Sequence, residues 1–288
     1  MMINVIPLIA YLVFAQLIGG LIAGTDRKIT ARMQGRKGPS VLQPFYDLFK
    51  LFSKETTIVD PLQYFYIIGF FVFTVFTGGL FFFGGDLLLV FFAVTLSEIF
   101  FVLCACSANS PFSTMGAQRE LFQIMCCEPM ILIVAIGYFY ATGSFSVSDI
   151  IGTKISSIVF MPGVFVGYCY ILTIKFRKSP FDLSTSHHAH QEMVKGVTVE
   201  LSGKTLGILE LSHWYENVFL LGVLALFIIN ASWWSWIAAL LVCVAVYFME
   251  ILVDNTFARV KWDTLIKSTW IVTLVFGMLN LFILSFIR

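Results

Sequence analysis

Charged residues are scarce in this chain, and their scarcity excludes an ordinary soluble domain. Only 12% of its 288 residues are charged, whereas soluble domains carry about 25%. Hydrophobic residues make up 59% of the sequence, and apolar runs of about 20 residues, long enough to cross a bilayer, recur along it. The composition therefore predicts an all-α, polytopic membrane protein that forms a single helical bundle over residues 1–288.

The motifs of several enzyme classes are also missing. The six cysteines form no Cys-x-x-Cys pair, so we expect no iron–sulfur, nickel or zinc site, and no other cofactor, held by this chain alone. We interpret them as buried free thiols. No glycine-rich nucleotide fingerprint, P-loop or serine-nucleophile elbow occurs. The basic loops suit membrane topology and protein docking, not nucleic-acid binding.

Eight apolar runs can each form a transmembrane helix of about 20 residues. They are Val5–Gly24, Leu62–Gly85, Leu87–Ala108, Met115–Ala141, Ile155–Ile174, Leu206–Asn230, Trp233–Val253 and Leu265–Ile287. The first run lacks the positive segment that precedes the apolar core of a signal peptide, so we interpret it as a transmembrane helix.

Positive charges indicate the orientation of the bundle. Of the 18 lysine and arginine residues, all but Lys154 and Arg288 fall on one side of the predicted spans. Because positively charged loops remain cytoplasmic, we expect a multi-pass protein of the cell membrane with both termini outside. The long loops, residues 25–61 and 175–205, then face the cytoplasm. We expect a soluble partner to dock there, since the outer connections are short.

The first long loop contains an amphipathic stretch. In Leu42–Glu55 the apolar residues recur at helical spacing and the polar residues fall on the other side. This pattern predicts an interfacial helix that lies in the plane of the membrane surface. A loop helix packed on protein fits the same pattern equally well.

Lys178–Gly203 is the longest polar interval after residue 61. It holds Glu192 and three of the four histidines, His187, His188 and His190. Hydrocarbon cannot satisfy its charges and backbone, so the interval must lie in water or in a protein-lined cavity. The histidine spacing differs from that of a metallohydrolase helix. We therefore favour a proton-handling or partner-contact segment over a metal site.

Acidic residues interrupt several apolar runs, although charges within a bilayer are costly. These acids are Glu98, Glu120, Glu128, Glu210, Glu216, Glu250 and Asp254. We interpret Glu128, Glu210 and Glu216, with Glu192 and Glu200 of the polar interval, as a hydrated carboxylate path. Desolvation favours the neutral acid, so such groups can exchange protons near neutral pH.

Three other polar residues have a structural interpretation. Glu120 and Glu250 fit ion pairs near helix ends, and His213 fits a hydrogen-bonding role within the bundle.

Four segments resemble one known family, the quinone-site membrane subunit of respiratory complex I. Asp26–Glu55 resembles its first cytoplasmic loop and Gly116–Glu128 its fourth helix. Ser179–Gly203 resembles its long loop and Ala258–Trp270 its last inner loop. The segments occur in the family's order and cover most of the predicted cytoplasmic side.

One stretch departs from the quinone enzymes. After Pro180–Leu183 those enzymes carry a short acidic stretch, whereas this chain carries Ser184–Glu192, STSHHAHQE, which is three residues longer. This form resembles the corresponding subunit of energy-converting nickel–iron hydrogenases of the Ech, membrane-bound hydrogenase and formate hydrogenlyase types. The short chain is most similar to the Ech type.

The resemblance implies a subunit that anchors a soluble hydrogenase arm. In that family, electrons from ferredoxin reduce protons to hydrogen, reversibly, and the reaction is coupled to H⁺ or Na⁺ translocation. The implied partners are the hydrogenase large and small subunits, an iron–sulfur ferredoxin-like subunit, an antiporter-like membrane subunit and lipid. The nickel–iron centre and the iron–sulfur clusters would be held by these partners.

The resemblance and the acid pattern together assign site residues. The expected proton-path and coupling set is Glu128, Glu192, Glu200, Glu210, Glu216, Arg119 and Asp182. The expected partner-docking set is Gln34, Arg36, His187, His188 and His190. Neither set includes a catalytic or metal-binding residue.

Two alternative functions remain open. One is a quinone-binding membrane subunit of a complex I-like NADH or ferredoxin:quinone oxidoreductase. The other is a stand-alone secondary transporter, although such folds often contain internal repeats and this sequence has none.

Replacing His187, His188 and His190 by alanine tests the interpretation of the polar interval. We expect impaired coupling or docking and an unchanged metal content of the purified chain, because histidines that handle protons or contact a partner bind no metal. Metal analysis beside an activity assay checks this. Stoichiometric loss of a metal with the three histidines would establish the metal site instead.

Overall fold

The computed structural model describes residues 5–55, 60–181, 183–185 and 195–287. The expected all-α membrane fold is confirmed in these residues. The α-helices are α1 Val5–Met33, α2 Gln43–Ser53, α3 Pro61–Phe83, α4 Leu87–Ser107, α5 Pro111–Thr142, α6 Val147–Ile151, α7 Pro162–Lys175, α8 Lys204–Leu226, α9 Trp233–Thr256, α10 Trp262–Val272 and α11 Leu279–Ile287. Short 3-10 turns, η2 Ser157–Val159 and η3 Gly196–Thr198, and a π-helical turn, η4 Thr273–Met278, complete the described elements.

Local sequence signals set the helix ends. Asp60 caps α3 by accepting a hydrogen bond from the amide of Leu62 at 3.0 Å, and Pro61 occupies the first helical position. Gly84 ends the helix in the left-handed conformation. Asp86 then caps α4 in the same way. A tight turn between α3 and α4 follows directly from these residues.

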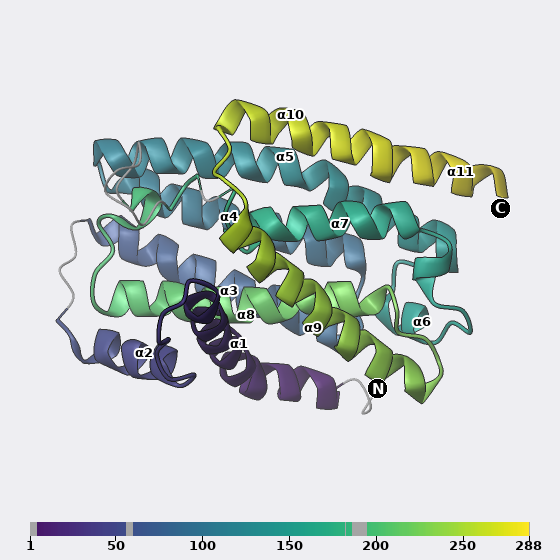
Figure 1. Cartoon of the computed structure of the whole chain (residues 1–288), viewed down its shortest axis with the longest axis horizontal. Helices are drawn as coiled ribbons and strands as arrows, with labels where there is room; N and C mark the ends of the chain where they lie inside the picture. Colours follow the sequence, from purple (N-terminus) through teal and green to yellow (C-terminus); the bar gives the residue numbers. More distant parts are fainter. Residues whose placement is uncertain (1–4, 56–59, 182, 186–194, 288) are drawn as a thin grey trace.

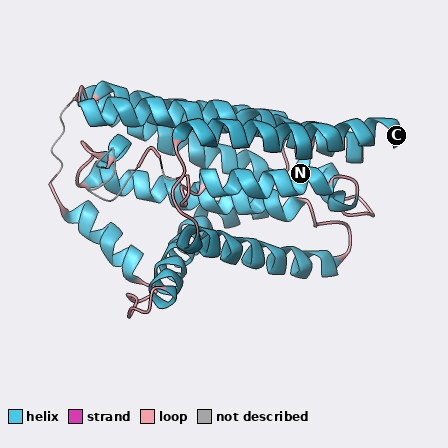
Figure 2. Ribbon diagram, turned by 45° about the horizontal axis from the view of Figure 1, so that its top comes forward, coloured by secondary structure: helices cyan, strands magenta, loops and turns pink. Residues whose placement is uncertain are grey.

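The long helices lie side by side, and α8 is central among them. It packs against α1, α2, α3, α7 and α9. In Figure 1 the bundle axis is nearly horizontal, with α1 and α9 crossing aslant. Both chain ends lie toward the right, with α6, whereas α2 lies at the opposite end (Figures 1 and 2). Positions in α8 therefore face several neighbours at once.

Six described helices are long and apolar enough to cross a membrane: α1, α3, α4, α5, α9 and the continuous helix from α10 to α11. The eight predicted spans are thus not all supported. The span predicted at Ile155–Ile174 is shorter, because η2 precedes α7 and Pro162 begins a helix of only 14 residues. The span predicted at Leu206–Asn230 corresponds to α8, whose first half carries polar side chains.

The first helix is longer than the predicted span Val5–Gly24. Helix α1 continues through Met33, so Arg27, Lys28 and Arg32 belong to it and not to a loop. Its 29 residues exceed the length needed to cross the hydrocarbon.

The amphipathic helix predicted at Leu42–Glu55 is present as α2 and packs on protein; its location in the membrane interface stays a prediction. Phe45 packs edge-on against Trp214 of α8, with ring centroids 5.2 Å apart. Tyr46 and Phe49 are 61% and 70% exposed. One face of α2 therefore packs on protein, and another presents aromatic rings to its surroundings, as interfacial helices do.

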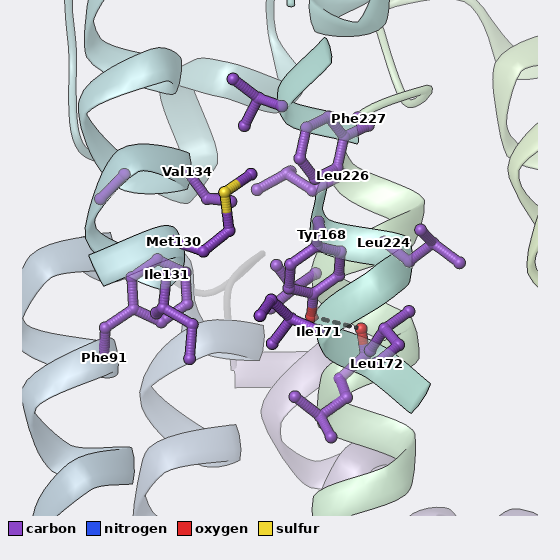
Figure 3. Close-up of a cluster of buried hydrophobic side chains, with 14 of the residues drawn as sticks. Phe91, Met130, Ile131, Val134, Tyr168, Ile171, Leu172, Leu224, Leu226 and Phe227 are labelled. Atoms are coloured by element: carbon purple, nitrogen blue, oxygen red, sulfur yellow. Dashed lines mark hydrogen bonds between the residues drawn. The ribbon is translucent and has the colours of Figure 1, made fainter. Parts of the chain in front are cut away.

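The main apolar core lies between α4, α5, α7 and α8 (Figure 3). Met130, Tyr168 and Phe227 are fully buried in it. The Tyr168 hydroxyl donates to the carbonyl of Leu220 at 3.0 Å, which satisfies this buried polar group. The core fixes α7 against α5 and α8, and thereby positions the residues that follow α7.

Gly116 allows η3 to approach α5 closely. A Cβ atom at this glycine would lie 2.5 Å from the backbone nitrogen of Val197 and 2.8 Å from the carbonyl carbon of Gly196. Backbone atoms cannot move aside as a flexible side chain can, so only glycine fits here.

Gly116→Ala should destabilise the folded chain by about 1–3 kcal/mol, since the new methyl group forces η3 away from α5. Thermal unfolding of the detergent-solubilised protein measures this. Gly207→Ala is the matched control, because its Cβ would make ordinary contacts of 3.4–3.5 Å with Phe52 and Leu51. Equal stability of the two variants would contradict the close approach.

Candidate functional site

The end of α7 and the segment after it bring three cations into the bundle, Lys175, Arg177 and Lys178. Lys175 is the last residue of α7, and Arg177 has a left-handed φ of 53°. The amide of Lys178 donates back to the carbonyl of Thr173 at 3.2 Å. The chain thus folds over the end of α7, and the side chains of Lys175 and Lys178 are only 8% and 9% exposed.

The first two cations pair with carboxylates on other helices. Lys175 forms an ion pair with Glu98 of α4, whose side chain is 6% exposed. Arg177 Nη2 donates to Glu120 Oε1 of α5 at 3.0 Å. The prediction that Glu120 forms an ion pair agrees with this geometry.

A histidine on α8 joins this group. Arg177 Nη1 contacts both ring nitrogens of His213, and the closer contact is with Nε2. On its other side, His213 Nδ1 lies 3.1 Å from Glu216 Oε2. We call Glu98, Glu120, Lys175, Arg177, His213 and Glu216 the central cluster.

The central cluster borders a cavity of about 20 Å³. Its lining comes from α4, α5, α7, α8 and the segment after α7, and comprises Glu98, Glu120, Gln123, Ile124, Cys127, Ile174, Lys175, Arg177 and Glu216. A cavity of this size has room for about one water molecule.

Negative groups outnumber positive groups in the central cluster. Glu98, Glu120 and Glu216 face two permanent cations, Lys175 and Arg177. Oε2 of Glu98 and Oε2 of Glu120 are buried and accept no hydrogen bond from the described residues. A buried carboxylate oxygen without a donor costs free energy. The cluster therefore favours an additional proton.

Arg177 stays charged throughout. Burial alone would lower the pKa of its guanidinium, but the carboxylates of Glu120 and Glu216 outweigh burial and raise that pKa above its usual range. A proton that enters or leaves the central cluster is therefore held by another group.

The third cation belongs to a second polar group at α1 and α9. Lys178 forms an ion pair with Asp26 of α1 and lies 5.6 Å from the ring centre of Tyr247. Buried Glu250 of α9 accepts a hydrogen bond from Thr173 at 3.5 Å. The ion pair predicted for Glu250 is not found among the described residues, where its hydrogen-bond partner is the Thr173 hydroxyl.

Glu210 lies apart from the central cluster. It borders a second cavity of about 110 Å³ between α1, α2 and α8, with Arg27, Asp47 and Trp214. Burial raises the pKa of Asp47, but hydrogen bonds from Arg27 at 2.8 Å and Gln43 at 3.0 Å outweigh it and hold the pKa below its usual range.

Other predicted site residues are dispersed. Arg119 lies 3.5 Å from the carbonyl of Leu183, so it contacts the start of the polar interval. Half-buried Glu128 follows cavity-lining Cys127 but does not itself line the cavity. Half-buried Glu200 lies just after η3.

Two residues of the predicted docking set lie at the end of α1. Gln34 donates to Asn255 of α9 at 3.1 Å and accepts a hydrogen bond from Arg36. Both side chains are exposed.

Asp182, His187, His188, His190 and Glu192 lie outside the described residues. Among the described members of the predicted proton-path set, only Glu216 belongs to the central cluster.

Sequence reasoning missed Glu98, Lys175 and Arg177 as site residues. Glu98 was recognised as an acid within an apolar run, but no partner was assigned. The available signal was the pair of cations at the end of the run Ile155–Ile174, since a chain with so few charges must pair those it buries.

Comparison with known proteins gives the family. The sequence model of a family described as NADH dehydrogenase matches residues 6–285. Formate hydrogenlyase subunit 4 of Escherichia coli K12 is 26% identical, over 92% of this chain and 93% of that protein. Hydrogenase-4 component C of the same strain is 25% identical, over 93% and 92%. A subunit of the NADH-quinone oxidoreductase of Geobacter metallireducens is 27% identical, over 98% and 92%.

One solved structure has the same fold. A chain of the membrane-bound sulfane sulfur reductase, an archaeal respiratory membrane complex, aligns with a TM-score of 0.83. The alignment covers 96% of this chain and 99% of that chain, at 24% sequence identity.

Lys175→Met should destabilise the protein by roughly 3–5 kcal/mol, because it leaves the carboxylate of Glu98 buried without its cation. Adding Glu98→Gln should restore most of this loss, since no unpaired charge then remains. Unfolding of the solubilised protein checks both variants.

Lys267→Met is the control for this pair. Lys267 and Asp263 form an exposed ion pair at 2.9 Å, with side chains 70% and 57% exposed, so the loss should stay below about 1 kcal/mol. A similar loss in Lys175→Met and Lys267→Met would contradict the role of the buried pair.

Proposed function

The chain belongs to the NADH dehydrogenase family, and from this membership we propose that it is the membrane subunit of a multisubunit energy-converting hydrogenase. In this role it anchors a hydrogenase arm and couples proton reduction or hydrogen oxidation to H⁺ or Na⁺ translocation. The similarity to formate hydrogenlyase subunit 4 and hydrogenase-4 component C over nearly their whole length supports this choice.

The observation that carries the proposal is the position of the central cluster. Its two cations, Lys175 at the end of α7 and Arg177 two residues later, directly precede the polar interval Lys178–Gly203. The resemblance assigns that interval to the docked arm. A displacement of the interval would move Lys175 and Arg177 relative to Glu98 and Glu120.

Such a displacement changes proton occupancy by electrostatics. Two unit charges 4 Å apart interact by about 4 kcal/mol at an effective dielectric constant of 20, but by about 1 kcal/mol in water. Withdrawing a cation from a buried carboxylate therefore favours proton uptake, and returning it favours release. A reaction at the docked arm can thus drive ion movement through the bundle.

The redox centres belong to partner subunits in this proposal. The nickel–iron centre, the iron–sulfur clusters and the ferredoxin contact lie on the hydrogenase large and small subunits and an iron–sulfur subunit. An antiporter-like membrane subunit continues the ion path. The long loops face the cytoplasm, and both termini face outward. Both termini lie toward one end of the bundle and α2 of the first long loop lies at the other, which supports this orientation (Figure 1).

A complex I-like quinone subunit is the second candidate. The similarity to the NADH-quinone oxidoreductase of Geobacter metallireducens favours it. The cavity beside Arg27, Asp47 and Glu210 is the larger of the two described above, but its volume of about 110 Å³ is below the 300–1,000 Å³ typical of ligand pockets. Nickel in the gently solubilised complex supports the hydrogenase, whereas bound quinone without nickel supports this alternative.

Glu98→Gln and Glu216→Gln should each reduce ion translocation at least tenfold, because a neutral amide cannot balance the cations and the proton of the central cluster as a carboxylate does. Glu128→Gln and Glu192→Gln are expected to act in the same direction. Translocation by the reconstituted complex in liposomes is measured beside hydrogen production. Metal content and subunit assembly should stay unchanged.

Asp263→Asn provides the control, since this exposed carboxylate lies far along the chain from the central cluster and pairs only with exposed Lys267 among the described residues. It should translocate ions as the wild type does. Wild-type translocation in all four glutamine variants would refute the proposed coupling role.

A further inference from the structure

His213 holds an unusual position, because a permanent cation lies against its ring. Arg177 Nη1 contacts both ring nitrogens, Nε2 more closely than Nδ1 at 3.2 Å, and Nδ1 lies 3.1 Å from Glu216 Oε2. A carboxylate only accepts, so the ring proton lies on Nδ1, and the guanidinium against the ring disfavours a second proton. Nδ1 then carries the single ring proton and donates it to Glu216. The observed geometry therefore corresponds to neutral His213.

Glu216 is the carboxylate of the central cluster whose direct partner is not a permanent cation. Glu98 has Lys175, and Glu120 has Arg177. Glu216 has His213, which becomes a cation only when it binds a second proton. With His213 neutral, three carboxylates face two cations. With His213 protonated, the numbers of negative and positive charges are equal.

Arg177 already has partners that it can keep when it leaves His213. Its Nη2 donates to Glu120 at 3.0 Å, and its guanidinium carbon lies 4.8 Å above the ring centre of Phe101. The rings of Phe70 and Phe101 contact the imidazole edge-on, with centroids 5.7 Å and 6.0 Å away, and Glu216 contacts Nδ1. Arg177 can therefore withdraw from the ring without leaving its charge unpaired.

The charged and titratable groups that face His213 come from every neighbouring element. Glu216 of α8 and Arg177 of the segment after α7 contact it directly. Both also line the adjacent cavity, where the other titratable groups are Lys175 of α7, Glu120 and Cys127 of α5, and Glu98 of α4. From α3 the contact is the apolar ring of Phe70.

We propose that His213 is the residue that accepts the additional proton of the central cluster, and that it does so by displacing Arg177. The proton arrives through water in the adjacent cavity and forms a bond with the Nε2 lone pair. The Arg177 guanidinium leaves Nε2 and keeps Glu120, and His213 forms an ion pair with Glu216. No electron moves in this step. The inference deepens the proposed function and rests on it.

The displacement of Arg177 links proton uptake at His213 to the backbone of the segment that follows α7. Arg177 is followed by Lys178 and Ser179, which contact Asp26 of α1 and Asp254 of α9. Uptake at His213 therefore changes the restraint on the first residues of the polar interval. The reverse also holds, since pulling the segment away removes Arg177 from Nε2.

The pH dependence of ion translocation in the reconstituted complex tests this exchange. The translocation rate of the wild type should fall along one limb of its pH profile as pH rises, because His213 then no longer takes up the proton. His213→Gln should abolish that limb and reduce translocation at least tenfold, since the amide does not titrate. Arg177→Gln should shift the limb upward by about one pH unit, because the cation facing Nε2 is gone.

The double variant separates a direct contact from a general effect. The double variant that combines Arg177→Gln with His213→Gln should show no pH-dependent limb of translocation, and therefore no shift of that limb. Arg177→Lys keeps a cation and should shift the pH-dependent limb less than Arg177→Gln does. If the complex with Arg177→Gln does not assemble, Arg177→Lys replaces it in the test. A wild type without the limb, or a His213→Gln variant with the wild-type profile, would overturn the proposal.

Nitrogen-15 NMR of the histidine-labelled complex gives a readout independent of turnover. The signal that disappears in His213→Gln should show a protonated Nδ1 and an unprotonated Nε2 at about pH 9. A doubly protonated ring there would refute the exchange. Failure of the proposed function is distinct, because Glu98→Gln and Glu216→Gln would then translocate normally. If those two fail to translocate while His213→Gln keeps its profile, only this inference falls.

Discussion

The ion pair between Lys175 of α7 and Glu98 of α4 joins two helices through charges that hydrocarbon cannot solvate. A buried charge is tolerable only with a partner, so the pair fixes where the end of α7 lies relative to α4. The apolar core around Tyr168 holds the rest of α7 against α5 and α8. Together they determine where Arg177 and Lys178 can reach.

Lys175, Arg177 and Lys178 contact residues of different helices. Lys175 pairs with α4, Arg177 contacts α5 and α8, and Lys178 pairs with α1. One short stretch of backbone therefore balances carboxylates on several helices. A subunit that couples reactions in a soluble arm to events within the membrane needs such a connection. Here it consists of cations on a single segment and requires no long chain of bound groups.

The sequence was sufficient for the fold class and for most helices. The apolar runs and the amphipathic pattern of α2 are local signals, and the structure agrees with them. The length predicted for the span Ile155–Ile174 was wrong, because hydrophobicity alone does not reveal that η2 precedes the helix and that α7 begins only at Pro162. The partners of Glu98 and Glu216 could not be predicted. They depend on which faces of α4, α7 and α8 meet, and hydrophobic spacing in very apolar helices barely distinguishes one face from another.

Helix α1 extends nine residues beyond its predicted end at Gly24. At 1.5 Å per residue its apolar run Val5–Gly24 measures about 30 Å and matches the hydrocarbon, whereas the following residues carry Asp26, Arg27 and Lys28. The helix crosses the bundle aslant (Figure 1), and a bilayer thinner than the apolar run would tilt it further. Asp26 lies on this helix and holds Lys178. Lipids of different acyl length would thus alter the depth at which Asp26 pairs with Lys178. Membrane composition then determines how tightly the segment after α7 is restrained.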